Sequence, residues 1–361
     1  MVGTSLASTK RNKIHIEFLR IICIYLVMFN HTGTNGFFLF SVAEYSKLYW
    51  FYMFISIACK VAVPIFFMIS GALLLGKNES IQDIYQKRIF KYVIVLVGTS
   101  FLYQVYRHYF QGTDIGFVIG LKQIYSSNAS VALWYLYSHI GVLIMLPLMR
   151  KMVRSMDNKD YVYIAVSSLI ITGIIPIIQY YCSKGTLWLN DSFSASLITA
   201  SNIMYVIMGY YFENILEEKY YNRKTVIALI GVSLLCIILC CFMTQYKADI
   251  TGELSEGKSQ AFHNSLIAVP AFTLYFCSKF FFMKVKANKK ILWLIQLGGG
   301  TTFGIYLAEG ILRERLLFVF IYLKPFLHIL PACLIYIFVA LIVGALIVAV
   351  LKKIPLLKEY I

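Results

Sequence analysis

The chain has 361 residues, of which 60% are hydrophobic and only 14% are charged. A soluble domain carries closer to a quarter charged residues, so the excess apolar surface requires lipid. The formal net charge of +16 does not indicate binding to nucleic acid, because Lys and Arg stand in short clusters between apolar runs.

Apolar runs long enough to cross a bilayer, about 20 residues each, recur along almost the whole sequence. They predict an all-α polytopic membrane protein with about ten transmembrane helices, folded as a single domain over residues 1–361 with no appended soluble domain. No small-residue cleavage site precedes the first run, so we interpret that run as a retained helix and not as a signal peptide. The predicted spans are 14–31, 48–76, 88–109, 131–149, 161–182, 193–212, 225–246, 262–283, 291–311 and 328–351.

The second and third runs are longer than a crossing needs, which predicts a tilt or a kink. Pro64 is the expected site of a kink, because it has no backbone N–H and its ring crowds the carbonyl of Lys60 one turn earlier. The eight Cys lie mostly inside apolar runs and without metal-ligand spacing. We therefore expect them to act as small hydrophobic residues, with neither disulfides nor a bound metal.

The distribution of Lys and Arg between alternate loops predicts the orientation in the membrane. Of the 33 basic residues, 22 fall on the side of the N-terminus, nine fall on the opposite side, and Arg20 and Lys60 lie inside predicted helices. The positive-inside rule then places both termini in the cytoplasm. No convincing internal repeat is present, which disfavours a transporter built from inverted repeats.

Ionisable side chains at membrane depth cost about 3 kcal/mol each on insertion scales, so they are candidates for function. Arg20 and His31 are eleven residues apart, which places them on nearly the same helix face about 16 Å apart along the axis. The alternatives are a local ion pair of Arg20 with Glu17 and an interfacial histidine in water. The full set of such residues is Glu17, Arg20, His31, Lys60, His139 and Glu309.

Three of these residues have open interpretations. Lys60 lies too deep to reach water easily and is expected to face a polar interior, either as a functional cation or as the partner of a carboxylate such as Glu309. The topology places Glu309 at the same outer depth as His31, where it either orients that imidazole or pairs with Arg313 at i+4. His139 lies in an aromatic cluster, which is as typical of a belt at the membrane interface as of a functional site. His139 is our second candidate base.

Several motifs resemble those of acyltransferase family 3, a family of integral membrane acyltransferases. The segment Ile16–Cys23 contains Arg20, and an apolar run then leads to Asn30 and His31, as in the family's signature of Arg, ten residues and His. In order and spacing the resemblance covers about the whole chain. The further matching segments are 63–71 (VPIFFMISG), 87–89 (KRI), 133–136 (LWYL) and 303–307 (FGIYL).

The resemblance implies transfer of an acyl group, usually acetyl, from cytoplasmic acyl-CoA to a hydroxyl of a surface or exported carbohydrate or its lipid-linked precursor. It implies a multi-pass protein of the bacterial cytoplasmic membrane that holds no permanent cofactor and has membrane lipid, but not nucleic acid, as a partner. Where this chain has Glu309 the family often has His, and where it has Lys60 the family often has Arg.

The expected roles follow from the chemistry of the residues. His31 is the base that takes the acceptor proton, because its unperturbed pKa lies near neutrality. Arg20 and Lys60 hold the pantetheine or stabilise an oxyanion. Lys87, Arg88 and Lys91 form a cytoplasmic cluster suited to the CoA phosphates, although topology alone explains such a cluster equally well. Trp134, Tyr135 and His139 are expected to contact substrate.

Two other functions remain open from the sequence. A transporter or flippase for a polyprenyl-linked or other amphiphilic glycan also keeps charges on a cavity wall. A membrane sensor without turnover is supported only by the number of helices. The pairing of Arg20 and His31 with the Ser70–Gly71 end of the second helix favours the acyltransferase, because transport has no chemical need for it.

Overall fold

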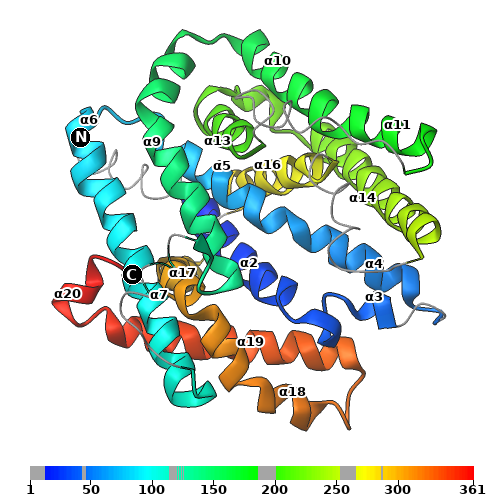
Figure 1. The fold of residues 1–361 in the computed structure, drawn as a ribbon. Coiled ribbons are helices and arrows are strands. Elements are labelled where there is room, and N and C mark those ends of the chain that lie inside the picture. The colour runs from blue at the N-terminus through cyan, green and yellow to red at the C-terminus, as the bar shows by residue number, and fades with distance from the viewer. Residues whose placement is uncertain are drawn as a thin grey trace. The chain divides into compact units, whose positions relative to one another are not determined.

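The computed structural model describes residues 13–42, 46–113, 120, 122, 124, 126–185, 201–252, 266–285 and 288–361. Every regular element within these ranges is a helix, as the sequence predicts (Figure 1). The elements in chain order are α2 (Ile14–Asn30), η1 (Gly33–Asn35), α3 (Leu39–Val42), α4 (Tyr49–Ala58), η2 (Cys59–Val61), α5 (Ala62–Leu74), α6 (Ile81–Ile84), η3 (Tyr85–Ile89), α7 (Phe90–Gln111), η4 (Val131–Leu133), α9 (Trp134–Ser155), α10 (Asn158–Leu169), η5 (Ile170–Ile174), α11 (Ile175–Cys182), α13 (Ser201–Tyr210), η6 (Tyr211–Ile215), η7 (Glu218–Tyr220), α14 (Arg223–Thr251), α16 (Ala268–Lys284), α17 (Lys289–Arg315), α18 (Leu317–Leu323), α19 (Ile329–Leu351) and α20 (Pro355–Lys358).

Seven helical stretches in the described part of the chain are long and apolar enough to cross a membrane. Each coincides with one of the predicted spans. The other three predicted spans correspond to α2, to α13 with η6, and to α16, which are shorter helices; residues 193–200 and 262–265 of these spans lie outside the described ranges. The seven stretches are Tyr49–Leu74, Ile81–Gln111, Val131–Ser155, Asn158–Cys182, Arg223–Thr251, Lys289–Arg315 and Ile329–Leu351.

The chain divides into two compact units. The first unit comprises Met1–Lys77 and Met149–Gly299, and the second unit comprises Asn78–Leu148 and Gly300–Ile361. Helices α9 and α17 each contribute residues to both units. All eight cysteines are free.

The kink predicted at Pro64 is present. Helix α4 ends at Ala58, a 3₁₀ turn covers Cys59–Val61, and α5 begins at Ala62. Pro64 cannot donate a backbone hydrogen bond to the carbonyl of Lys60, so regular α-helix does not continue through this turn. The third predicted span is also irregular, since a π-helical turn at Tyr85–Ile89 separates α6 from α7.

Glycines allow α5 and α13 to cross closely in the core of the first unit. A Cβ added at Gly71 would overlap the backbone carbonyl of Val206 on α13, and one added at Gly209 would overlap the backbone of Met68 on α5. Helices that meet through small residues gain close backbone contact, which is the usual basis of helix association in membranes. This crossing holds the sixth predicted span against the second.

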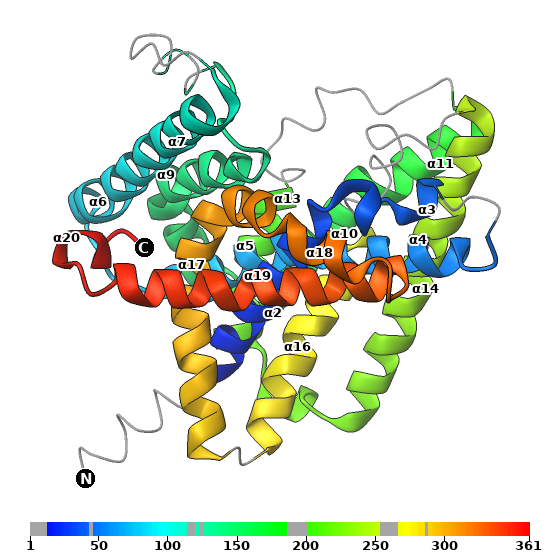
Figure 2. The same cartoon turned by 90° about the horizontal axis from the view of Figure 1, so that it is seen from below.

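Helix α17 also packs closely against its neighbours through its small residues. In the first unit, a Cβ at Gly299 would lie 2.9 Å from the Cα of Glu17 on α2. In the second unit, a Cβ at Gly304 would lie 2.7 Å from the side chain of Val348 on α19. Helices α18 and α19 lie side by side in the same unit (Figure 2).

Candidate active site

The first part of the candidate site lies in the N-terminal half of α2. The positive-inside pattern predicts that this half is the cytoplasmic one. Arg20 Nη1 donates to Oε1 of Glu17 at 2.8 Å, so the expected i, i+3 ion pair is present. Both side chains keep about a quarter of their surface exposed, 29% for Arg20 and 24% for Glu17. A guanidinium has five N–H donors, so this ion pair leaves Arg20 with further donors for a ligand. The close approach of Gly299 to Glu17 fixes the carboxylate that orients Arg20.

His31 caps the other end of α2. Its backbone N–H bonds to the carbonyl of Met28 at 3.3 Å, and its side chain is half-buried. The turn that follows is fixed by Thr32, whose hydroxyl donates to the carbonyl of Phe29 at 2.7 Å and accepts from the N–H of Phe37 at 3.0 Å. The imidazole therefore projects from a rigid helix end and not from a long loop.

Lys60 lies in the 3₁₀ turn that adjoins this helix end. The Asn30 side-chain amide donates to the carbonyl of Cys59 at 3.5 Å, and the next residues in the two segments are His31 and Lys60. Lys60 Nζ is 5.6 Å from the ring centroid of Phe37, within cation–π range. The structure thus brings the segments of His31 and Lys60 together, and it supplies an aromatic face for the ammonium group that the sequence did not indicate.

In the second unit, His139 lies inside a cluster of aromatic rings. It stacks on Tyr135 at 5.7 Å and lies 4.8 Å from Tyr92, with ring centroids as reference points. Only 4% of His139 is exposed, whereas Trp134 is 39% exposed. The Nδ1 atom of His139 has no hydrogen-bond partner within the part of the chain that the structure describes. His139 is therefore a buried residue and not a member of a solvated interface belt.

Glu309 is completely buried in the second unit. Its Oε2 accepts from Nε of Arg313 at 3.4 Å, which is the i, i+4 pair expected as one alternative. The N–H of Gly310 donates to the Tyr103 hydroxyl at 3.1 Å, so α7 contacts α17 beside this carboxylate. His31 belongs to the first unit and Glu309 to the second, so a dyad of the two remains a prediction.

The predicted donor-binding cluster is already engaged in local ion pairs. Lys87 Nζ lies 2.6 Å from Oδ1 of Asp83, and Arg88 bonds both oxygens of Glu79 at 2.9 and 2.5 Å. Lys91 is half-buried on the first turn of α7. The π-helical turn at Tyr85–Ile89 carries two of the three basic residues. A phosphate bound here must therefore compete with two carboxylates.

A second polar cluster in the first unit was missed by the sequence analysis. His15 Nε2 lies 3.0 Å from Oε2 of Glu213, and the Tyr275 hydroxyl donates to the same oxygen at 2.9 Å. Lys279 Nζ donates to the carbonyls of Phe212 and Glu213 at 2.8 and 2.9 Å. The available signal was the position of His15 and Lys279 inside predicted spans, where ionisable residues are unusual.

The same cluster continues to the loop before α14. The Tyr221 hydroxyl donates to the carbonyl of Phe212 at 2.6 Å, and its ring lies 5.1 Å from Lys279 Nζ. Burial, reinforced by the charge of Glu213, raises the pKa of Tyr221, so the hydroxyl remains a donor. These contacts join the beginning of α2 to η6 and α16. Among the described residues, no group of His, Cys, Asp or Glu is arranged to hold a metal ion.

Comparison with known proteins gives one clear match. The acyltransferase domain of acyltransferase family 3 matches residues 14–353, which is nearly the whole chain. No curated protein and no solved structure matches the chain. The match includes every residue of the candidate site, from Arg20 to Glu309, and all seven stretches that can cross a membrane. The chain therefore belongs to acyltransferase family 3 and is a membrane-bound acyltransferase.

Proposed function

We propose that this protein transfers an acetyl group from cytoplasmic acetyl-CoA to a hydroxyl of a cell-surface or exported polysaccharide, or of its lipid-linked precursor. It does so as a multi-pass protein of the bacterial cytoplasmic membrane. The observation that carries the proposal is the arrangement on α2, where Arg20 lies in the helix, His31 caps its end and the Lys60 turn adjoins that end. Membership of the family supports acyl transfer in general. The side chains of Arg20, His31 and Lys60 are our reason for proposing a hydroxyl group as the acceptor.

In the proposed reaction His31 acts as the general base. The acceptor oxygen attacks the thioester carbonyl, a carbon–oxygen bond forms, and the carbon–sulfur bond breaks. His31 takes the proton of the hydroxyl and returns it to the leaving thiolate, so free CoA and the acyl ester are the products.

The two cations have separate proposed roles. Lys60 stabilises the oxyanion that develops on the thioester carbonyl, because it lies in the segment next to His31. Arg20 holds the pantetheine arm or its amide groups nearer the cytoplasm. Glu17 keeps the guanidinium oriented through the 2.8 Å ion pair, so we expect Arg20 to require this neighbour.

Donor and acceptor recognition are assigned to the second unit. Lys87, Arg88 and Lys91 bind the CoA phosphates, with Asp83 and Glu79 holding two of these side chains in place until a phosphate displaces them. The aromatic cluster of Trp134, Tyr135 and His139 contacts substrate. The buried Nδ1 atom of His139 is suited to one directional hydrogen bond with that substrate.

The test uses purified protein in detergent with radiolabelled acetyl-CoA and a pool of membrane glycans. We expect label in the glycan with the wild type and none with His31→Ala, at equal protein yield and thermal stability. His108→Ala is the matched control, because His108 is an exposed histidine that contacts the carbonyl of Thr113 and the ring of its neighbour Tyr109. It should retain full activity.

Two outcomes would overturn parts of the proposal. Transfer by His31→Ala at the wild-type rate removes His31 as the base, and His139→Ala is then the next variant to measure. Binding of a lipid-linked glycan without binding or turnover of acyl-CoA would exclude the enzymatic reaction and favour a flippase.

A further inference from the structure

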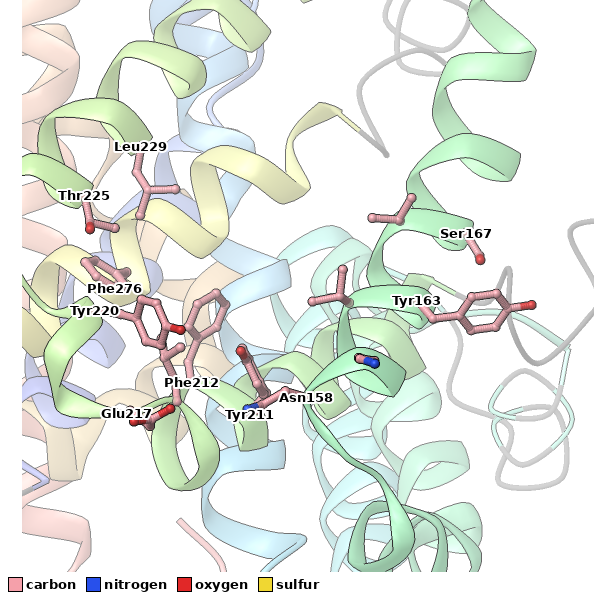
Figure 3. Close-up of a pocket in the computed structure, with 14 residues that line it drawn as sticks. Asn158, Tyr163, Ser167, Tyr211, Phe212, Glu217, Tyr220, Thr225, Leu229 and Phe276 are labelled. Carbon is pink, nitrogen blue, oxygen red and sulfur yellow. The ribbon is translucent and has the colours of Figure 1, made fainter.

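A groove of about 760 Å³ opens in the first unit, away from the candidate site residues of α2. Its walls come from α10, from η6, from the loop before α14, from the start of α14 and from Phe276 of α16. Figure 3 shows Tyr163 and Ser167 of α10 on one side and Phe212, Phe276 and Leu229 on the other. Nothing in the proposed reaction uses this groove.

The groove has a polar end and an apolar end. Asn158, Lys159, Glu217 and Thr225 line it where α10 and α14 begin. Ser167 lies nine positions after Asn158 along α10, so the lining extends about 14 Å into the helical region. The walls there are Val162, Val166, Leu229 and aromatic rings. This gradient matches an amphiphile whose head remains at the membrane surface.

Helix α10 is exposed where it lines the groove. Val162 and Val166 of α10 are 53% and 46% exposed, and both belong to a stretch that can cross a membrane. The hydroxyl-bearing rings of Tyr163, Tyr211 and Tyr220 also line the groove. Tyrosine is enriched where the lipid chains meet the headgroups, so the lining has the composition of a lipid contact.

Charge at the polar end favours an anionic headgroup. Residues 151–160 and 217–224, which include the lining residues of this end and their neighbours in the sequence, contain six basic and four acidic side chains. Three of the acidic side chains have local partners: Asp157 and Asp160 form the capping box of α10, and Glu217 pairs with Lys219 at 2.9 Å. Lys159 lines the groove and is exposed. The positive-inside pattern assigns this end to the cytoplasmic leaflet, where basic pockets between helices bind anionic lipids.

We propose that this groove binds an anionic membrane phospholipid, with one acyl chain between α10 and α14 and the phosphate headgroup beside Lys159. The site is separate from acyl transfer and does not depend on the proposed reaction. A bound lipid bridges α10 to the η6 and α14 segments, so it stabilises the folded protein by mass action.

The test is native mass spectrometry of the full chain in detergent, titrated with phosphatidylglycerol and with phosphatidylcholine of the same chains. We expect phosphatidylglycerol to bind about fivefold more tightly, the effect of roughly one favourable charge at a membrane surface. Lys159→Ala should remove this preference, whereas Lys358→Ala, which changes an exposed lysine on α20, should keep it.

Filling the groove tests the position of the chain. Val166→Trp should reduce binding of both lipids at least tenfold, and Val232→Trp is the control because Val232 is similarly exposed, at 49%, but does not line the groove. Equal lipid binding by both variants would overturn the proposal. Displacement of the lipid by soluble CoA, with Val166→Trp weakening CoA, would instead assign the groove to a water-soluble anion.

A crosslinking measurement keeps the proposal testable if Val166→Trp does not fold. Phosphatidylglycerol with a photoactivatable diazirine on its acyl chain is irradiated with the wild-type protein, and the labelled peptides are sequenced. Label concentrated in residues 158–167 and 211–229 supports the site. Label spread evenly over the exposed faces of the other helices shows ordinary lipid contact and overturns it.

Discussion

His15 at the start of α2 and Glu213 in the π-helical turn η6 are 198 residues apart in the sequence, and their side chains meet at 3.0 Å. Only 2% of His15 is exposed, and the Glu213 carboxylate also accepts from Tyr275. A buried carboxylate with several donors stabilises a fold mainly because losing one partner leaves the others unsatisfied. This contact holds α2, and therefore Arg20, against α16 and η6.

Replacing Glu213 with Gln should lower the free energy of unfolding by about 2–4 kcal/mol, because the charge that faces Lys279 and His15 is lost. Thermal unfolding in detergent measures the change. Glu217→Gln is the matched control: its side chain is 53% exposed and pairs with Lys219, so we expect a change below about 0.5 kcal/mol. Equal effects of the two substitutions would contradict a structural role for the cluster.

Because α5 and α13 cross closely, we expect one methyl group added at the crossing to lower the stability of the protein strongly. Gly209→Ala should destabilise the protein by about 1–3 kcal/mol, because its Cβ would overlap the backbone of Met68, which cannot move aside as a side chain can. Gly231→Ala on α14 is the control, since a Cβ there meets open space and Ala is the better helix former. It should be neutral or stabilising. A neutral Gly209→Ala would show that the two helices are further apart.

The charge at position 60 should matter more than the shape of the side chain. We expect Lys60→Arg to retain at least a third of the transfer rate, because a guanidinium also stacks well on an aromatic face such as the Phe37 ring. Lys60→Met should reduce kcat at least tenfold through loss of oxyanion stabilisation. Initial rates with labelled acetyl-CoA give the comparison. If Lys60→Met is as active as the wild type, the ammonium group has no part in the reaction.

Substitution of Glu309 tests whether its carboxylate has a catalytic or a structural role. If it orients His31, Glu309→Gln should lower kcat about tenfold or more and leave the KM for acetyl-CoA little changed, while Arg313→Gln should retain most of the rate. The measurement is kcat and KM across a pH series for both variants. Similar losses of thermal stability for the two variants, with normal kcat for each, would identify Glu309 as the structural partner of Arg313 at 3.4 Å.

The sequence by itself determined the positions of the helices and the contacts between residues within one helical turn. In the part of the chain that the structure describes, each apolar run forms helix near its expected position, because a chain that leaves water must satisfy every backbone group internally and a helix does so locally. The break at Pro64 and the ion pair of Arg20 with Glu17 also follow from local rules, since the partners lie within one turn.

Tertiary structure alone decided which distant residues meet. The meeting of His15 with Glu213, the crossing of Gly71 and Gly209, and the burial of His139 among aromatic rings all depend on how helices pack. Hydrophobic periodicity tells which residues avoid water, but in a membrane both lipid-facing and core-facing positions are apolar. The sequence pattern therefore carries little information about which face of a helix meets a neighbour, and packing supplies it.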